Sequence, residues 1–157
     1  MPLSANGRTG AAFMAELILD GLSAVDEMFA ELSEIPWDVT SEALDAMASV
    51  AEQKVRSSGE SMGVRDPESQ VHILDKITHT KPKKTDSGGR SDVTFSGSRT
   101  RGRTRTRNAE IAFINEYGKR GQTARPFIRL AAEQGGEEIT APGEKIIGDW
   151  FEKTARD

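Results

Sequence analysis

The stretch IAFINEYGKRGQTARPFIRLA, residues 111–131, contains the local signals that decide how the chain folds. Apolar residues alternate with polar or small ones at its start, which is typical of a strand. Gly118 can adopt a positive φ and so end that strand sharply. Pro126 presets the backbone angle of a first helical turn, and Phe127 can anchor that turn in the core. The stretch therefore predicts a strand, a loop over residues 119–125 and a helix that begins near Pro126.

Directly upstream, residues 98–108 read SRTRGRTRTRN and place an arginine at every second position. Alternate side chains of an extended strand share one face, so one straight strand would present all five guanidinium groups together. A bend is expected at Gly102, and a hairpin tip there would divide the arginines between faces. Alternating residues flank the run, at Val93 and Phe95 and over 109–113, which predicts an antiparallel hairpin. The five arginines are Arg99, Arg101, Arg103, Arg105 and Arg107.

Four amphipathic segments are expected to form helices. Residues 11–34 carry an apolar stripe with acidic residues on the remaining surface, and Pro36 ends this segment. A second helix is expected from about residue 41 to 57. The third begins near Pro126 and ends at the paired glycines 135 and 136, and the last runs from about Pro142 to Thr154. The stripe of the first segment consists of Phe13, Leu17, Leu22, Val25, Phe29 and Leu32.

The middle of the chain predicts the sheet. Residues 70–80 contain several β-branched residues and could form a strand or a short helix, whereas the composition of residues 81–92 indicates a flexible linker. The order helix, helix, strands, helix, helix predicts an α+β fold, in which helices pack a small antiparallel β-sheet that carries a long arginine-rich hairpin or arm. We expect residues 1–157 to form one domain, with an acidic helical part at 1–60, a flexible basic linker and arginine-rich arm at 81–108, and a strand plus C-terminal helices at 109–157.

The composition excludes several classes of protein. The chain has 157 residues, enough to bury a core, but its 36% hydrophobic and 6% aromatic content predicts a modest one. The absence of cysteine excludes disulfides, thiolate metal sites and cysteine nucleophiles. No apolar run approaches the ~20 residues of a membrane span, and the first ten residues lack the layout of a signal peptide. We therefore expect synthesis in the cytoplasm and no membrane partner.

The net charge of −4 conceals a strong segregation of charge along the chain. Residues 1–62 and 130–157 are acidic, with net charges of −8 and −4, whereas residues 76–129 carry a net charge of +10. This layout allows an acidic surface of one copy to meet a basic surface of another, or the basic strip to face nucleic acid. A solvated basic loop is the simplest alternative.

Candidate catalytic residues are few. His72 and His79 lack the closely spaced companions of a zinc site. Glu110 and Glu116 lie six residues apart in a strand-like run, where they could share a face as paired carboxylates. No companion base, metal set or glycine-rich phosphate loop accompanies them. We therefore expect no enzymatic activity, no cofactor and no metal.

Residues 111–131 resemble the signature of the tail-component, or tail-completion, proteins of long-tailed bacteriophages. Members show a hydrophobic strand that ends in an acidic–aromatic–glycine turn, a short loop, and an alanine/arginine–proline–phenylalanine element that opens a helix. The apolar segment ILDKI, residues 73–77, also resembles the layout of the family, which does not account for the arginine run. The matching residues, which define a corner of the fold, are Glu116, Tyr117, Gly118, Arg125, Pro126 and Phe127, with Ala124, Ile128 and Arg129 beside them.

Within this corner, Arg125 and Glu116 are close enough in sequence to meet across the loop as an ion pair, which is worth less than about 1 kcal/mol if exposed. These residues have the character of a fold-defining corner and not of an active site.

The resemblance implies a structural virion protein that forms a closed ring, a homo-oligomer of six copies, at the tail top or neck. Such a ring completes the tail and helps join it to the head. The implied partners are further copies of the chain, neighbouring neck proteins, and the tail tube or terminator protein, with DNA passing through the lumen. The protein would be made in the cytoplasm of the bacterial host and located in the tail or neck of the virion.

The partner of the arginine run stays open at this stage between an acidic protein surface and DNA. The alternative function is a non-specific nucleic-acid-binding module that uses the arginine-rich arm to contact the phosphate backbone. The run contains no interleaved aromatic residues for stacking on bases, and it matches no recognition-helix or finger pattern.

Overall fold

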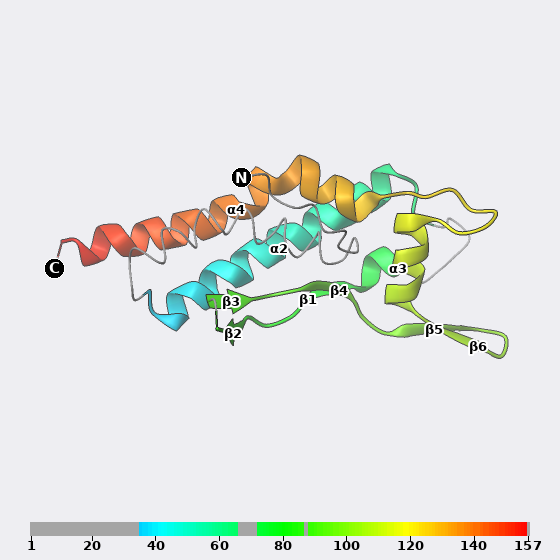
Figure 1. Cartoon of the computed structure of the whole chain (residues 1–157), viewed down its shortest axis with the longest axis horizontal. Coiled ribbons are helices and arrows are strands. Elements are labelled where there is room, and N and C mark those ends of the chain that lie inside the picture. The colour runs from blue at the N-terminus through cyan, green and yellow to red at the C-terminus, as the bar shows by residue number, and fades with distance from the viewer. Residues whose placement is uncertain (1–34, 66–71, 87, 157) are drawn as a thin grey trace, which may run out of the picture.

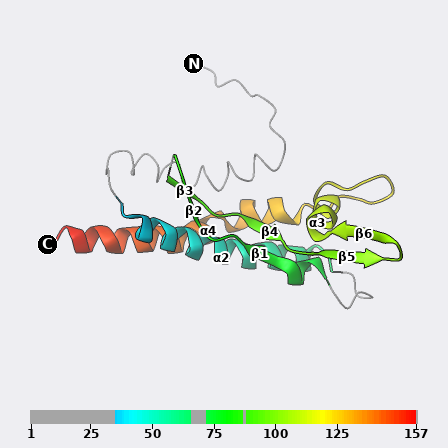
Figure 2. The ribbon, with the colours of Figure 1, turned by 90° about the horizontal axis from the view of Figure 1, so that it is seen from below.

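The computed structural model describes residues 35–65, 72–86 and 88–156. In this part of the chain two long helices, α2 (Trp37–Ser61) and α4 (Phe127–Thr154), lie side by side and antiparallel (Figures 1 and 2). The helix expected over residues 11–34 lies outside the described residues. The other elements are the 3₁₀ helix η1 (Ile73–Lys76), the helix α3 (Asn108–Tyr117) and the strands β1 (Ile77–His79), β2 (Lys83–Thr85), β3 (Gly88–Arg90), β4 (Val93–Phe95), β5 (Ser98–Arg101) and β6 (Thr104–Arg107).

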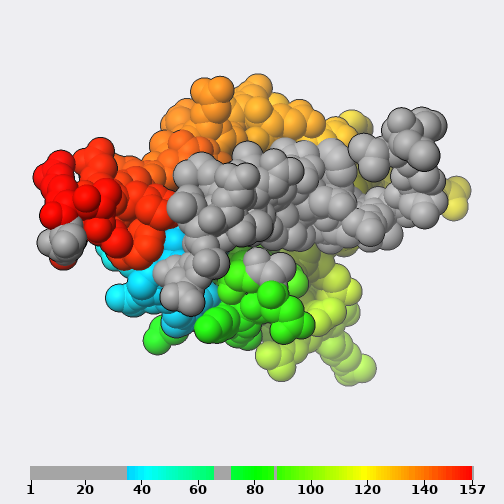
Figure 3. All heavy atoms as spheres, turned by 60° about the vertical axis from the view of Figure 1, so that its left-hand side comes forward, coloured from blue at the N-terminus to red at the C-terminus, as the bar shows by residue number. Residues whose placement is uncertain are grey.

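The described residues confirm the α+β class, with short antiparallel strands packed by helices. The strands form three separate two-stranded ladders, β1–β4, β2–β3 and β5–β6. Helix α2 packs between α4 and the strands, so that the orange and red atoms of α4 lie on the other side of the molecule from the green atoms of the strands (Figure 3). Among the described helices, none is long and apolar enough to cross a membrane.

Helix α2 confirms the amphipathic helix expected over residues 41–57 and extends it at both ends. Its buried side chains recur every three or four residues along one face, as helical packing requires. His79 of β1 contacts this helix on another side, where its Nδ1 lies 2.9 Å from Glu52 Oε2. The residues buried by α2 are Ala43, Leu44, Met47, Ala48, Ala51, Val55 and Gly59.

Helix α4 is continuous, so the two helices expected over residues 126–136 and 142–154 are in fact one. The prediction that the glycines 135 and 136 end a helix was wrong because Gly135 is buried against the side chain of Lys54. Gly143 likewise faces Met47, with no room for a Cβ. These glycines therefore allow α2 and α4 to approach closely, and that packing outweighs their low helix propensity and the proline at position 142.

Residues 81–92, expected to be a flexible linker, contain the β2–β3 hairpin. Lys83 pairs with Arg90 and Thr85 with Gly88, which has a φ of 129°. A Cβ on Gly89 would lie 2.6 Å from Leu44 Cδ1 and 2.9 Å from Trp37 Cζ3. The glycines that suggested flexibility thus let this hairpin pack on α2. The preceding segment combines both forms expected for it, since η1 leads directly into strand β1.

The prediction of a strand around residues 109–113 is wrong, because this segment belongs to helix α3. Only three apolar residues alternate here, at positions 109, 111 and 113, and the buried positions follow a helical spacing instead. Ala112 is 2% exposed, whereas Phe113, which the strand would have buried, is 60% exposed. Helix α3 buries Asn108, Ala112, Asn115 and Glu116.

The centre of the core lies where α2, η1, β4 and α4 meet. Phe127 and Leu74 are completely buried, and the ring of Phe95 meets that of Phe127 edge to face with centroids 6.0 Å apart. A Cβ on Gly59 would overlap Leu74 Cδ2 and lie 3.2 Å from Phe127 Cδ2. The end of α2 therefore requires glycine at this position.

We expect Gly59→Ala to lower the free energy of unfolding by about 1–2 kcal/mol, because the cost of overpacking exceeds the gain in helix propensity. Gly136→Ala is the matched control. Its Cβ would meet nothing within 4 Å, so alanine there should raise the free energy of unfolding by about 0.5–1 kcal/mol. Urea unfolding of both variants measures the difference, and equal effects would contradict the close approach at Gly59.

Candidate functional site

The carboxylate of Glu116, near the end of α3, caps the beginning of α4. Its Oε2 accepts a hydrogen bond from the backbone N–H of Ile128 at 2.8 Å, and its Oε1 accepts one from Arg129 at 3.1 Å. Glu116 is only 7% exposed. The first N–H groups of a helix have no partner within the helix and carry partial positive charge, so a buried carboxylate there is satisfied electrostatically and by hydrogen bonding.

Gly118 turns the chain after α3 as predicted, with a φ of 76°. A Cβ at this position would lie 2.8 Å from the carbonyl oxygen of Gln122 and 2.9 Å from the nitrogen of Ala124. Both the φ angle and the space therefore require glycine. The loop returns to α3 when the N–H of Arg125 donates to the carbonyl of Asn115 at 2.6 Å.

The ion pair considered between Arg125 and Glu116 is not formed. Arg125 Nη1 donates instead to the backbone carbonyl of Gly63 at 2.8 Å, which ties the loop to the end of α2. The prediction was wrong because the N–H groups of α4 take both oxygens of Glu116, a pairing that sequence proximity does not indicate. The corner therefore connects α2, α3 and α4.

The other corner residues divide between the core and the surface. Phe127 is completely buried, as predicted, and anchors the first turn of α4. Pro126 precedes that turn, with φ −75° and ψ 62°, and lies just outside the helix. Tyr117 is 49% exposed, and its ring centroid lies 4.7 Å from that of Phe113. The corner is thus built directly by four of the six residues, while Pro126 leads into α4 and Tyr117 stays half exposed. The four are Glu116, Gly118, Arg125 and Phe127.

The arginine run forms the β5–β6 hairpin, with Gly102 at its tip. Gly102 has a φ of 61°, the positive value that a type II′ turn needs at its first central residue. Opposite residues of an antiparallel pair lie on the same face of the ladder. The cross-strand pairs are Ser98 with Arg107, Arg99 with Thr106, Thr100 with Arg105, and Arg101 with Thr104.

This register divides the arginines between two faces. Arg99 and Arg101 share one face, Arg105 and Arg107 share the other, and Arg103 is in the turn. The bend predicted at Gly102 is therefore confirmed, and it divides the arginines between faces as a hairpin tip there was expected to do, so the run is not one straight strand. All but Arg99 are exposed, and the hairpin projects at the opposite end of the described residues from the C-terminal end of α4 (Figures 1 and 2).

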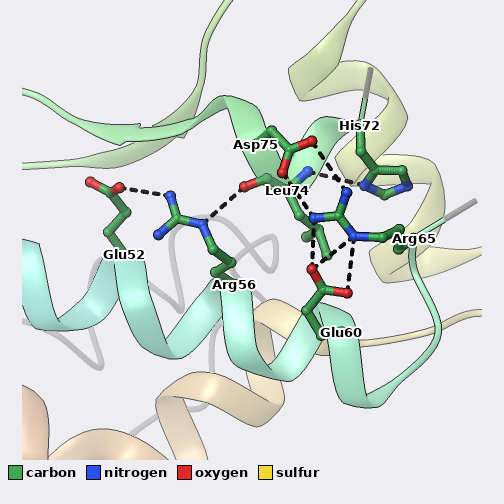
Figure 4. A network of polar contacts seen from close by, with 7 residues as sticks. All are labelled: Glu52, Arg56, Glu60, Arg65, His72, Leu74 and Asp75. Atoms are coloured by element: carbon green, nitrogen blue, oxygen red, sulfur yellow. Dashed lines mark hydrogen bonds and ion pairs between the residues drawn. The ribbon is translucent and has the colours of Figure 1, made fainter. Parts of the chain in front are cut away.

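A polar network joins the end of α2 to η1 (Figure 4). Arg65 donates from Nη2 to Glu60 Oε1 at 2.7 Å and to Asp75 Oδ1 at 2.8 Å. These hydrogen bonds hold the pKa values of Glu60 and Asp75 below their usual range. Arg56 makes a parallel connection, donating to Glu52 at 2.9 Å and to the carbonyl of Leu74 at 3.2 Å. The network is a structural clamp, since each charge in it has an opposite partner.

His72 caps η1 from a buried position. Its Nδ1 accepts a hydrogen bond from the N–H of Leu74 at 3.3 Å, and its side chain is 3% exposed. Burial, reinforced by the nearby Arg65 and Arg99, lowers the pKa of His72. The second histidine, His79, lies apart from it beside Glu52. The described residues contain no group of three or more histidine, aspartate or glutamate side chains placed to hold a metal ion.

The carboxylates Glu110 and Glu116 have different environments. Glu110 is exposed at the first turn of α3, where its Oε2 lies 3.4 Å from the nitrogen of Arg107, whereas Glu116 is buried at the end of that helix. Sequence reasoning missed the cap on α4 and the buried amides of Asn108 and Asn115. The amide of Asn108 donates to Ser96 O at 2.7 Å and that of Asn115 to Ile111 O at 2.9 Å. A helix predicted over residues 108–116 would have placed Asn108, Asn115 and Glu116 on one buried face.

The fold and the site together define an α+β protein with a rigid helical corner and a basic hairpin that projects from it. Comparison of the chain with protein-family models, with curated proteins and with solved structures finds no match.

We expect Glu116→Ala to lower the free energy of unfolding by about 1–3 kcal/mol, because two N–H groups of α4 lose their acceptor. Glu137→Ala, on the exposed side of the same helix α4, should change it by less than about 0.5 kcal/mol. Denaturant unfolding of the two variants is the test, and equal losses would contradict the capping role.

Stability should also depend on the protonation of His72. Because its pKa is lowered in the folded state, the unfolded chain binds the proton more readily, and stability falls as the pH drops below about 6.5. His72→Asn keeps an acceptor for the N–H of Leu74 but does not titrate, so it should flatten this slope. The free energy of unfolding is measured at about pH 5 and pH 7.5 with and without His72→Asn, in a chain that also carries His79→Gln. Because the chain has two histidines, His72 is then its one imidazole. An unchanged slope would contradict the assignment.

Proposed function

We propose that this chain is a structural virion protein of a long-tailed bacteriophage that forms a ring at the tail top or neck. The ring completes the tail and helps join it to the head. The observation that carries the proposal is the corner, because the residues that resemble the tail-completion signature build one connected unit. Glu116, Gly118 and Phe127 each have a defined structural role in it.

The distribution of charge supports assembly from identical copies. The β5–β6 hairpin carries five arginines and no acidic residue, and it lies at one end of the described residues. Helix α4 runs to the other end and carries six exposed acidic residues against three exposed basic ones. Its acidic residues are Glu133, Glu137, Glu138, Glu144, Asp149 and Glu152.

The basic hairpin and the net acidic surface of α4 favour a head-to-tail contact, in which the hairpin of one copy meets the α4 surface of the next. A head-to-tail contact closes into a ring when the rotation between copies allows it. Six copies are the number that the resemblance implies. The hairpin has an arginine pair on each face, so one face can contact a neighbouring subunit while the other faces the lumen and passing DNA.

The same hairpin supports the alternative function, a module that binds nucleic acid without sequence preference. Because the arginines are divided between faces, a duplex on one side would meet two of them plus Arg103 at the tip. Three phosphate contacts predict a slope of about −3 for log affinity against log salt. A monomeric protein with this salt dependence on duplex DNA would favour the alternative.

We expect the full chain to form a discrete oligomer, detected by light scattering, that assembles on purified tail tubes. Replacing Arg101, Arg103 and Arg105 by glutamine should weaken association by about tenfold or more, because the hairpin loses its charge. Replacing Lys145, Lys153 and Arg156 by glutamine removes the same charge from the C-terminal end of the described residues and should leave association intact. A wild-type chain that stays monomeric and does not bind tail tubes would contradict the proposal.

A further inference from the structure

An apolar groove of about 340 Å³ lies along the seam between α2 and α4. Its floor is made by buried side chains of the two helices, among them Leu44, Ala51, Val55, Ala131 and Ile139. Strand β4 and the segment before it line the groove, as does helix α3.

Two aromatic side chains of α3 line the groove and remain exposed. Phe113 is 60% exposed and Tyr117 49% exposed, and they are the large hydrophobic residues most accessible to water among the described ones. Exposed aromatic rings next to an apolar floor are characteristic of a surface that another segment covers. The groove therefore requires an occupant with an apolar face.

We propose that residues 11–34 of the same chain dock in this groove as an amphipathic helix. The sequence gives this segment an apolar stripe, from Phe13 to Leu32, that is suited to an apolar floor. The segment is joined to α2 through Ile35 and Pro36, and α2 reaches the groove at Leu44. This docking does not require that the chain form the proposed ring.

The geometry of the junction favours docking within one chain. Pro36 has φ −56° and ψ 145°, which is extended backbone, so the chain changes direction as it enters α2. A helix of 24 residues spans about 36 Å, whereas the floor of the groove along α2, from Leu44 to Val55, spans about 17 Å. The segment is therefore long enough to fold back over the groove, and the short connection gives it a high effective concentration there.

Charge favours the same occupant. Residues 11–34 contain six acidic residues and no lysine or arginine. The β2–β3 hairpin, whose Gly89 and Arg90 line the groove, carries the exposed lysines Lys83 and Lys84, whereas Arg90 is paired with Asp92 at 2.7 Å. An acidic amphipathic helix thus matches the apolar floor and would lie near the two lysines of β2.

Spin labels in the full chain test this inference. The native chain has no cysteine, so Ala30→Cys in the segment and Thr85→Cys at the exposed end of β2 supply two unique label sites. We expect a single narrow distance distribution by pulsed electron resonance, unchanged when the labelled chain is diluted with excess unlabelled chain. Phe29→Glu on the apolar stripe and Phe113→Asp on the groove should each abolish the narrow peak.

Ser23→Glu is the matched control, because residue 23 lies opposite the stripe at helical spacing and adds the same charge. It should preserve the narrow peak. A broad distribution in the unsubstituted chain would overturn the proposal, and so would a narrow peak that Phe113→Asp leaves intact. A peak that disappears on dilution would overturn it in favour of docking on a second copy.

Discussion

The contact between the carboxylate of Glu116 and the first turn of α4 is the interaction on which the rest of the structure depends. It places a buried negative charge at the positive end of a 28-residue helix. Because Glu116 belongs to α3, the same contact sets the direction in which α4 leaves the corner. Phe127, in the capped turn, then fills the centre of the core against the end of α2.

From this corner, the two long helices run together and separate the basic hairpin from the C-terminal end of α4. Glycines at positions 135 and 143 let α4 lie close against α2, and α4 is one continuous helix along this contact. The basic hairpin and the C-terminal end of α4 are thereby held apart (Figure 1). This separation, together with the resemblance of the corner, supports the proposed role in assembly.

Several parts of this arrangement follow from the sequence. The apolar spacing of residues 41–57 predicts α2, and the glycines at 102 and 118 predict sharp turns that the φ angles confirm. Phe127 was correctly expected in the core. The candidate site was predictable only in part. The five arginines were identified, but their division between two faces depends on the register of the hairpin.

The sequence by itself determined the features that local chemistry controls, namely the α+β class, the amphipathic face of α2, the turns at glycine and the burial of the phenylalanine after Pro126. Each of these depends on the steric limits or the periodicity of a few neighbouring residues. Only the tertiary structure decided that residues 108–117 are a helix, that α4 continues through its glycines, and that Glu116 binds the backbone of α4 and not Arg125. In these cases the deciding partners, such as Lys54 for Gly135 and Gly63 for Arg125, are far away in the sequence and adjacent only after folding.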